Sequence, residues 1–300
     1  MNTTKIPLLA ILSLLTAMTL WGSSFIAMKI AMQELGPLSV VFGRMALATV
    51  CFALIAPKLV KTIRYQSGDW KPLLFMAFCE PCLYFVFESH ALKYTQASEA
   101  GMVTALLPLM VTGVARVLFK ENLSMTGFAG LLVSVLGVIL MSAFSEVREN
   151  APNPLLGNTL EFLAMICAAG YIISLKWLTS RYSPLFLTAV QSAVGAVFFL
   201  PALLIEPLPE SVSFSSMAAV VYLGLVVSIV AYGCNNYGVS QIPASQASIF
   251  INLIPVVTLI IAAVVLGESL GPLQMLGGGM VFAGVFLSNI RRRARTPSTL

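Results

Sequence analysis

The stretch from Cys79 to His90, CEPCLYFVFESH, places two glutamates inside an apolar run. The run covers about residues 72–92, a length that crosses a bilayer as a helix. An ionisable side chain at mid-membrane costs roughly 2.5–3.5 kcal/mol, so it normally faces a cavity or a partner. Glu80, Tyr84 and Glu88 recur every four residues and would share roughly one face of that helix. This face is therefore a candidate binding surface for a small polar molecule or a proton.

Glu80 is the sharpest candidate because it lies near the middle of the run. Burial disfavours the charged form of a carboxyl group, so Glu80 could exchange a proton or hold an ammonium group. The alternative is a protonated glutamate that only hydrogen-bonds a neighbouring helix. Pro81 removes a backbone donor and loosens the helix beside it. His90 and Glu99 are expected at the outer interface, with His90 as an interfacial residue rather than a proton relay.

Further candidates are aromatic, hydroxyl and amide side chains within other apolar runs: Trp21, Ser24, Tyr84, Tyr232, Asn235 and Asn252. Each could contact a substrate, and each could equally serve helix packing. Arg44 is expected to form an ion pair with Glu88, ahead of binding an anion. Prolines within three of the apolar runs could form a gate, since broken helices often mark transport sites: Pro81, Pro108 and Pro255.

Composition indicates a membrane protein, because 58% of the 300 residues are hydrophobic and 10% are charged. A soluble domain carries roughly 25% charged residues. The five cysteines fall within apolar runs and are expected as buried thiols, so we predict no metal site and no cofactor. The chain contains no phosphate-binding loop, HExxH or GxSxG motif, which argues against an enzyme. The basic run 291–295 is expected to anchor the chain to lipid and does not imply nucleic acid.

The sequence predicts ten membrane spans, at about 7–31, 37–56, 72–92, 98–119, 124–144, 158–177, 184–204, 216–239, 245–266 and 272–290. If the N-terminus is cytoplasmic, 12 Lys and Arg residues fall on the inside and only Lys29, Lys93 and Arg148 on the outside. Positive charge is enriched in cytoplasmic loops, so we expect both termini inside, in an inner membrane.

The two halves of the chain repeat each other at a shift of 147 residues, and the matched pairs include Pro108 with Pro255 and Glu121 with Glu268. Each half holds five spans, so residues 1–147 and 148–300 are expected as two inverted five-helix repeats in an all-α fold. In this register Glu88 matches Asn235, which suggests a shared cavity wall, whereas Glu80 matches Val227. Glu121 and Glu268 are expected to cap the helices that follow them.

The matched segments also carry a family resemblance. ASQASIFINLIPVVTLIIAAVVLGESL, from Ala244, resembles the signature of the EamA family in the drug/metabolite transporter superfamily. ASEAGMVTALLPLMVTGVARVLFKENL, from Ala97, is its counterpart, and WGSSF at Trp21 to Phe25 is also typical of the family. The resemblance implies ten helices in two inverted repeats around a cavity that opens alternately to each side. It also implies export of amino acids, amines or other small metabolites.

Together these observations predict a secondary active transporter, a permease that exports amino acids or amines and exchanges protons. Its partners would be a small-molecule substrate, H⁺ and membrane lipids. An uncoupled facilitator is the alternative within transport. A membrane-embedded metabolite sensor is the alternative from another class, and the short tail after residue 290 argues against it.

Overall fold

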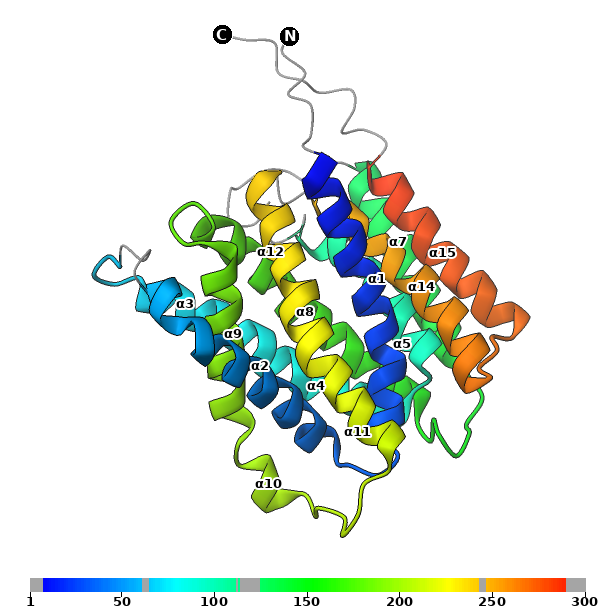
Figure 1. The fold of residues 1–300 in the computed structure, drawn as a ribbon. Helices are drawn as coiled ribbons and strands as arrows, with labels where there is room; N and C mark the ends of the chain where they lie inside the picture. Colours follow the sequence, from blue (N-terminus) through cyan, green and yellow to red (C-terminus); the bar gives the residue numbers. More distant parts are fainter. Residues whose placement is uncertain (1–7, 61–64, 112, 114–124, 243–246, 290–300) are drawn as a thin grey trace, which may run out of the picture.

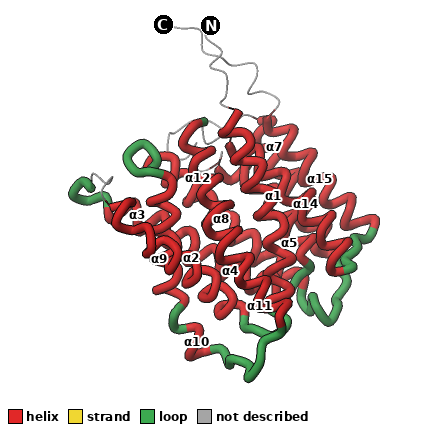
Figure 2. The backbone as a smooth tube through the Cα atoms, viewed as in Figure 1, coloured by secondary structure: helices red, strands yellow, loops and turns green. Residues whose placement is uncertain are grey.

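The computed structural model describes residues 8–60, 65–111, 113, 125–242 and 247–289. These residues form an all-helical bundle, and their only β pairing is an isolated bridge between Arg148 and Ala151 (Figure 2). In chain order the elements are α1 (Leu8–Ala31), α2 (Pro37–Val60), α3 (Trp70–Ala77), η1 (Phe78–Leu83), α4 (Tyr84–Tyr94), α5 (Ala97–Val103), η2 (Thr104–Leu106), α7 (Met125–Ala143), α8 (Pro154–Leu178), α9 (Pro184–Phe199), α10 (Ala202–Ile205), α11 (Phe214–Val221), η3 (Tyr222–Ala231), α12 (Tyr232–Gln241), η4 (Ser248–Asn252), α14 (Leu253–Ile261), η5 (Ala262–Leu266) and α15 (Pro272–Asn289).

Seven stretches of the described chain are long and apolar enough to cross a membrane. Three shorter apolar helices, Ala97–Val111, Leu132–Ala143 and Pro272–Leu287, fall at the fourth, fifth and tenth predicted spans. A multi-pass helical membrane protein is thus confirmed. The count of ten spans and the inverted relation of the halves stay predictions.

Helix α1 runs through the bundle and defines its two ends (Figure 1). We call the end where α1 begins, at Leu8, the near end, and the end where it stops, at Ala31, the far end. Helix α15 ends at the near end, beside the start of α1 (Figure 1). Helix α1 packs against α12, α14 and η3, which come from the second half of the chain. The core therefore forms between the two halves.

Helices α7 and α15 pack side by side at one edge of the bundle (Figure 1). Small residues make this possible, because a Cβ added to Gly277 would lie 2.6 Å from the Gly137 carbonyl oxygen. Ser134 Oγ donates to the Val281 carbonyl oxygen at 3.1 Å. Close backbone approach of this kind is a common basis of helix association in lipid.

Irregular helical segments interrupt the spans at repeat-matched places. The π-helical segment η1 lies 147 residues before part of the π-helical segment η3. The 3₁₀ segments η2 and η4 lie just before Pro108 and Pro255, respectively. Glu80 in η1 has non-helical backbone angles (φ −148°, ψ 115°), and the Glu80–Pro81 peptide bond is cis. In these segments some backbone N–H and C=O groups lack the partners that a regular helix would give them within an apolar span.

Carboxylates hold the N-termini of helices that lie far away in the sequence. Glu206 accepts hydrogen bonds from the backbone N–H groups of Leu38 (3.1 Å) and Ser39 (2.7 Å) at the start of α2. Glu34 accepts one from the Ser213 N–H (2.7 Å) at the start of α11. Negative charge at a helix N-terminus is favourable, so these contacts tie the halves together.

Glu268 makes the third contact of this kind. Its carboxylate accepts from the Ala97 N–H at 3.0 Å and from the Ser98 N–H at 2.8 Å. The expectation that Glu268 caps the helix following it is therefore wrong, since it caps α5 instead. The left-handed turn at Gly267 (φ 65°) ends the preceding helix and leaves Glu268 beside α5. Glu121, its repeat counterpart, lies outside the described residues.

Candidate functional site

A narrow cavity of about 40 Å³ lies at the centre of the bundle, between helices from both halves. A buried water needs roughly 10–15 Å³ on this measure, so the cavity holds about three waters and must widen to admit a metabolite. It is lined by Trp21, Ser24, Phe25, Arg44, Glu80, Tyr84, Phe85, Glu88, Thr104, Leu107, Met165, Ala168, Tyr171, Ile172, Tyr232, Ile251 and Ile254.

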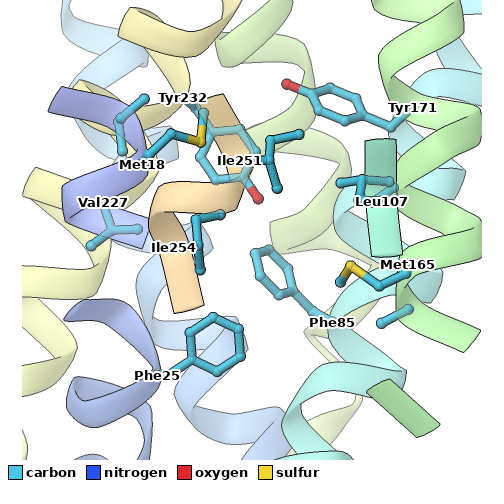
Figure 3. Close-up of a cluster of buried hydrophobic side chains, with 14 of the residues drawn as sticks. Met18, Phe25, Phe85, Leu107, Met165, Tyr171, Val227, Tyr232, Ile251 and Ile254 are labelled. Atoms are coloured by element: carbon cyan, nitrogen blue, oxygen red, sulfur yellow. The ribbon is translucent and has the colours of Figure 1, made fainter. Parts of the chain in front are cut away.

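The cavity walls are mostly apolar and aromatic. Phe25, Phe85, Met165, Ile254 and Tyr232 line the cavity, and their side chains lie in one cluster of buried residues (Figure 3). Such walls lower the local polarity and strengthen the electrostatic interactions of the few polar groups among them.

Glu80 is the most elaborately held of these polar groups. The Tyr232 hydroxyl donates to Glu80 Oε1 at 2.5 Å, and the Trp21 and Tyr232 rings pack edge to face at a centroid distance of 5.2 Å. The Glu80 carbonyl oxygen, left free by the irregular backbone, accepts from Gln191 Nε2 at 3.1 Å. The side chain is only 4% exposed. The sequence thus builds a buried carboxylate whose position is fixed from α9 and α12.

Glu88 and Arg44 face the same cavity but do not form the expected ion pair. Tyr84 donates to Glu88 Oε1 at 2.8 Å. In the described part of the chain Arg44 has no ion-pair contact with Glu88. Instead its Nε donates to Ser228 Oγ at 3.0 Å and its guanidinium lies 4.5 Å above the Phe85 ring. These contacts offset the burial of the charge and leave Arg44 available to an anionic group.

Six of the predicted binding residues line the cavity: Trp21, Ser24, Glu80, Tyr84, Glu88 and Tyr232. Asn235 and Asn252 do not line it. The Asn235 amide donates to the Tyr171 hydroxyl at 3.2 Å, so it lies behind a cavity residue and not on a wall shared with Glu88. Asn252 lies between the lining residues Ile251 and Ile254. The predicted gating residues Pro81, Pro108 and Pro255 are buried beside the cavity elements without lining it.

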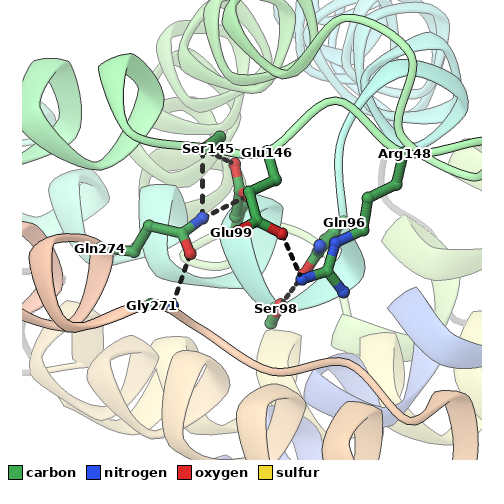
Figure 4. A network of polar contacts seen from close by, with 8 residues as sticks. All are labelled: Gln96, Ser98, Glu99, Ser145, Glu146, Arg148, Gly271 and Gln274. Carbon is green, nitrogen blue, oxygen red and sulfur yellow. Dashed lines mark hydrogen bonds and ion pairs between the residues drawn. The ribbon is translucent and has the colours of Figure 1, made fainter.

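A polar network near the far end holds Glu99, which is fully buried within the protein (Figure 4). Its carboxylate accepts from Ser145 Oγ (2.7 Å), Gln274 Nε2 (2.8 Å) and Asn158 Nδ2 (2.9 Å). These donors come from the α7–α8 connection, α15 and α8. His90, which is half-buried, contacts the Val86 carbonyl oxygen through Nδ1 at 2.8 Å. The network ties α5, α8 and α15 together near the far end.

Sequence reasoning missed Tyr171 and Glu161, both on α8. Tyr171 lines the cavity and donates to Asn236 Oδ1 at 2.6 Å. Glu161 is fully buried, and α8 packs against α4, the helix that carries Glu88. The signal for Glu161 was present, since it is an ionisable residue within the predicted span 158–177.

The arrangement suits binding of a small molecule that carries both charges. Glu80 and Glu88 can receive an ammonium group, and Arg44 can receive a carboxylate. The Trp21 Nε1–H is buried and has no hydrogen-bond partner among the described residues, so it offers a further donor. No group of three or more metal-ligating side chains occurs within the described ranges.

A bundle of membrane-spanning helices around a buried, charged cavity is the architecture of a membrane transporter. The EamA-like transporter family model matches residues 8–143 and again residues 155–290. The chain therefore belongs to the EamA-like transporter family.

Individual relatives agree with this assignment. The chain is 29% identical to the uncharacterized transporter YcxC of Bacillus subtilis, with 92% of this chain and 91% of that protein covered. It is 26% identical to a probable terminal-alkyne amino-acid exporter of Streptantibioticus cattleyicolor, with 96% and 97% covered. A crystal structure with 20% identity shares the fold at a TM-score of 0.67, covering 94% of this chain and 98% of that one.

Proposed function

We propose that this protein is a secondary active transporter that exports small amino acids or amines across the inner membrane, coupled to protons. The observation that carries the proposal is the central cavity, in which Glu80 and Glu88 lie with Arg44 between apolar walls. An amino acid presents an ammonium and a carboxylate group, which match these opposite charges. An amine would use the carboxylates alone.

The relatives support the same substrate class. One of them bears the name of a probable amino-acid exporter, and its similarity extends over nearly the whole of both chains. The two family matches are offset by 147 residues, which supports two repeats and hence alternating access. In the proposed cycle the cavity opens to the near end and the far end in turn, with bending at the irregular segments around Pro81, Pro108 and Pro255. Both termini would be cytoplasmic.

A resistance screen identifies the substrate. Cells that overproduce the protein are challenged with a panel of amino acids, amines and toxic analogues, beside cells with an empty vector. The proposal expects protection against compounds that carry an ammonium group. Protection against none of the panel, or only against compounds that lack an amino group, would contradict the assigned substrate class.

Reconstituted protein then tests the coupling. Proteoliposomes loaded with the identified substrate are given an inward proton gradient, and efflux against the substrate gradient is measured. A proton-coupled exporter drives this uphill efflux. An uncoupled facilitator only equilibrates the substrate, whatever the pH difference.

A further inference from the structure

Glu161 is a buried residue that does not line the central cavity and has no role in the binding site described above. It lies on α8, and the residue has no solvent exposure. Neither of its carboxylate oxygens has a hydrogen-bond partner among the described residues. An unpaired polar group in apolar surroundings costs several kcal/mol, and more if it is charged. A glutamine at position 161 would avoid part of this free-energy cost and a leucine all of it. The presence of a carboxyl group at this position therefore suggests a functional role.

The position of Glu161 connects the far end to the cavity. Met165, Ala168 and Ile172 follow it at intervals of four, three and four residues on one face of α8, and all three line the cavity. Asn158 precedes it by three residues on this face and donates to Glu99 in the far-end network. Glu161 therefore lies between that network and the cavity.

Glu88 on α4 is the charged neighbour that acts on Glu161, and helices α4 and α8 pack together. Two neighbouring carboxylates in apolar surroundings repel and cannot both stay ionised, so such a pair shares a proton. Of the two carboxylates, only Glu88 accepts a hydrogen bond from a described residue, the Tyr84 hydroxyl at 2.8 Å. This bond favours the negative charge on Glu88 and the proton on Glu161.

We propose that Glu161 is the proton-binding residue of the transport cycle, acting as a pair with Glu88. The inference rests on the proposed transport function and adds the carrier of the coupled proton. When the substrate leaves the cavity, the pair takes up a proton from the far side, and Glu161 holds it. When the ammonium group of the next substrate approaches Glu88, that proton is released to the near side. The proton on the pair and the ammonium group of the substrate each carry one positive charge. Each replaces the other, so the charge in the cavity balances in both halves of the cycle.

Other ionisable groups face this pair from the elements packed on α8. They are Tyr84 on α4, Glu80 on η1, Tyr232 on α12 and Arg44 on α2, which line the cavity with Glu88, and Glu99 on α5, which binds Asn158 on α8. Glu80 and Glu99 each have hydrogen-bond donors in place, unlike Glu161.

The test compares wild type with Glu161→Gln in proteoliposomes that contain a pH-sensitive dye. Substrate exchange without a gradient and substrate-dependent proton flux are measured separately. We expect Glu161→Gln to retain exchange and to lose proton flux and gradient-driven transport. Glu146→Gln is the matched control, because that side chain is 74% exposed, and it should retain all three activities. Proton flux in Glu161→Gln equal to that of wild type would overturn the inference.

The outcomes separate this inference from the proposed function. If wild type moves no amino acid or amine, the proposed function fails. If wild type exchanges substrate without moving protons, the proposed function loses its coupling and the role of Glu161 is refuted. If Glu161→Gln does not fold, Glu161→Asp keeps a carboxyl group at a changed position and should displace the pH profile of coupled flux. A profile that superimposes on wild type would then overturn the inference.

Discussion

The contact between Glu268 and the start of α5 gives a prediction of measurable size. Glu268 accepts three hydrogen bonds, from the Ala97 N–H, the Ser98 N–H and Ser98 Oγ at 2.7 Å. All three residues are buried. Because no water reaches the site, each lost bond leaves an unsatisfied group.

Three substitutions should form a graded series. Ser98→Ala removes the hydroxyl bond only and leaves both backbone donors satisfied, at a cost of about 1 kcal/mol. Glu268→Gln keeps one carbonyl oxygen and presents an amide NH₂ to the other backbone donor, so one N–H is orphaned at about 1–3 kcal/mol. Glu268→Ala orphans both, at roughly 2–6 kcal/mol.

The assay is unfolding of the purified protein in detergent micelles, followed by circular dichroism and by size-exclusion chromatography after heating. We expect stability to fall in the order wild type, Ser98→Ala, Glu268→Gln, Glu268→Ala. If Glu268→Ala were as stable as Ser98→Ala, the buried cap would contribute nothing and the reasoning would be refuted.

Three further predictions concern other parts of the bundle. The Ser213 N–H holds the pKa of the Glu34 carboxyl below its usual 4.5. Wild type should therefore be more stable than Glu34→Gln above pH 4.5, and this difference should vanish as acid protonates Glu34. Thermal melts at a series of pH values would detect the change. Gly277→Ala should destabilise the protein by about 1–3 kcal/mol, because the added methyl group would overpack on α7. Gly279→Ala should be neutral or stabilising, because no described atom lies within 4 Å of the added methyl group. Equal melting temperatures of the two variants would contradict this. Tyr232→Phe removes a hydrogen bond to the Glu80 carboxylate, worth about 1.5–3 kcal/mol. The initial rate of transport at low substrate concentration should therefore fall roughly ten- to hundredfold. An unchanged initial rate would count against an ionised Glu80.

Much of the fold could be predicted from the sequence because the bilayer imposes a simple rule on composition. Apolar runs of about 20 residues must be helices, which predicted the seven stretches that could span a membrane. The apolar runs also made Glu80 and Glu88 conspicuous, and both line the cavity. An ionisable side chain within an apolar run was therefore a usable signal for the cavity.

The residues that sequence reasoning misplaced depend on contacts between distant segments. Glu268 caps α5, about 170 positions earlier in the chain, and no local pattern encodes that pairing. Arg44 is offset by Ser228 and the Phe85 ring instead of a carboxylate, an outcome that depends on side-chain packing. Asn235 binds Tyr171 and lies behind it, a placement that depends on how α8 packs against α12.

Substrate counterflow shows whether the cavity around Glu80 is the transport site. Proteoliposomes loaded with unlabelled substrate are diluted into labelled substrate with no pH gradient, for wild type, Glu80→Gln and the control Glu146→Gln. We expect wild type and Glu146→Gln to take up label, and Glu80→Gln to lose this uptake or to show a large rise in KM. Counterflow by Glu80→Gln with an unchanged KM would show that Glu80 does not belong to the transport site.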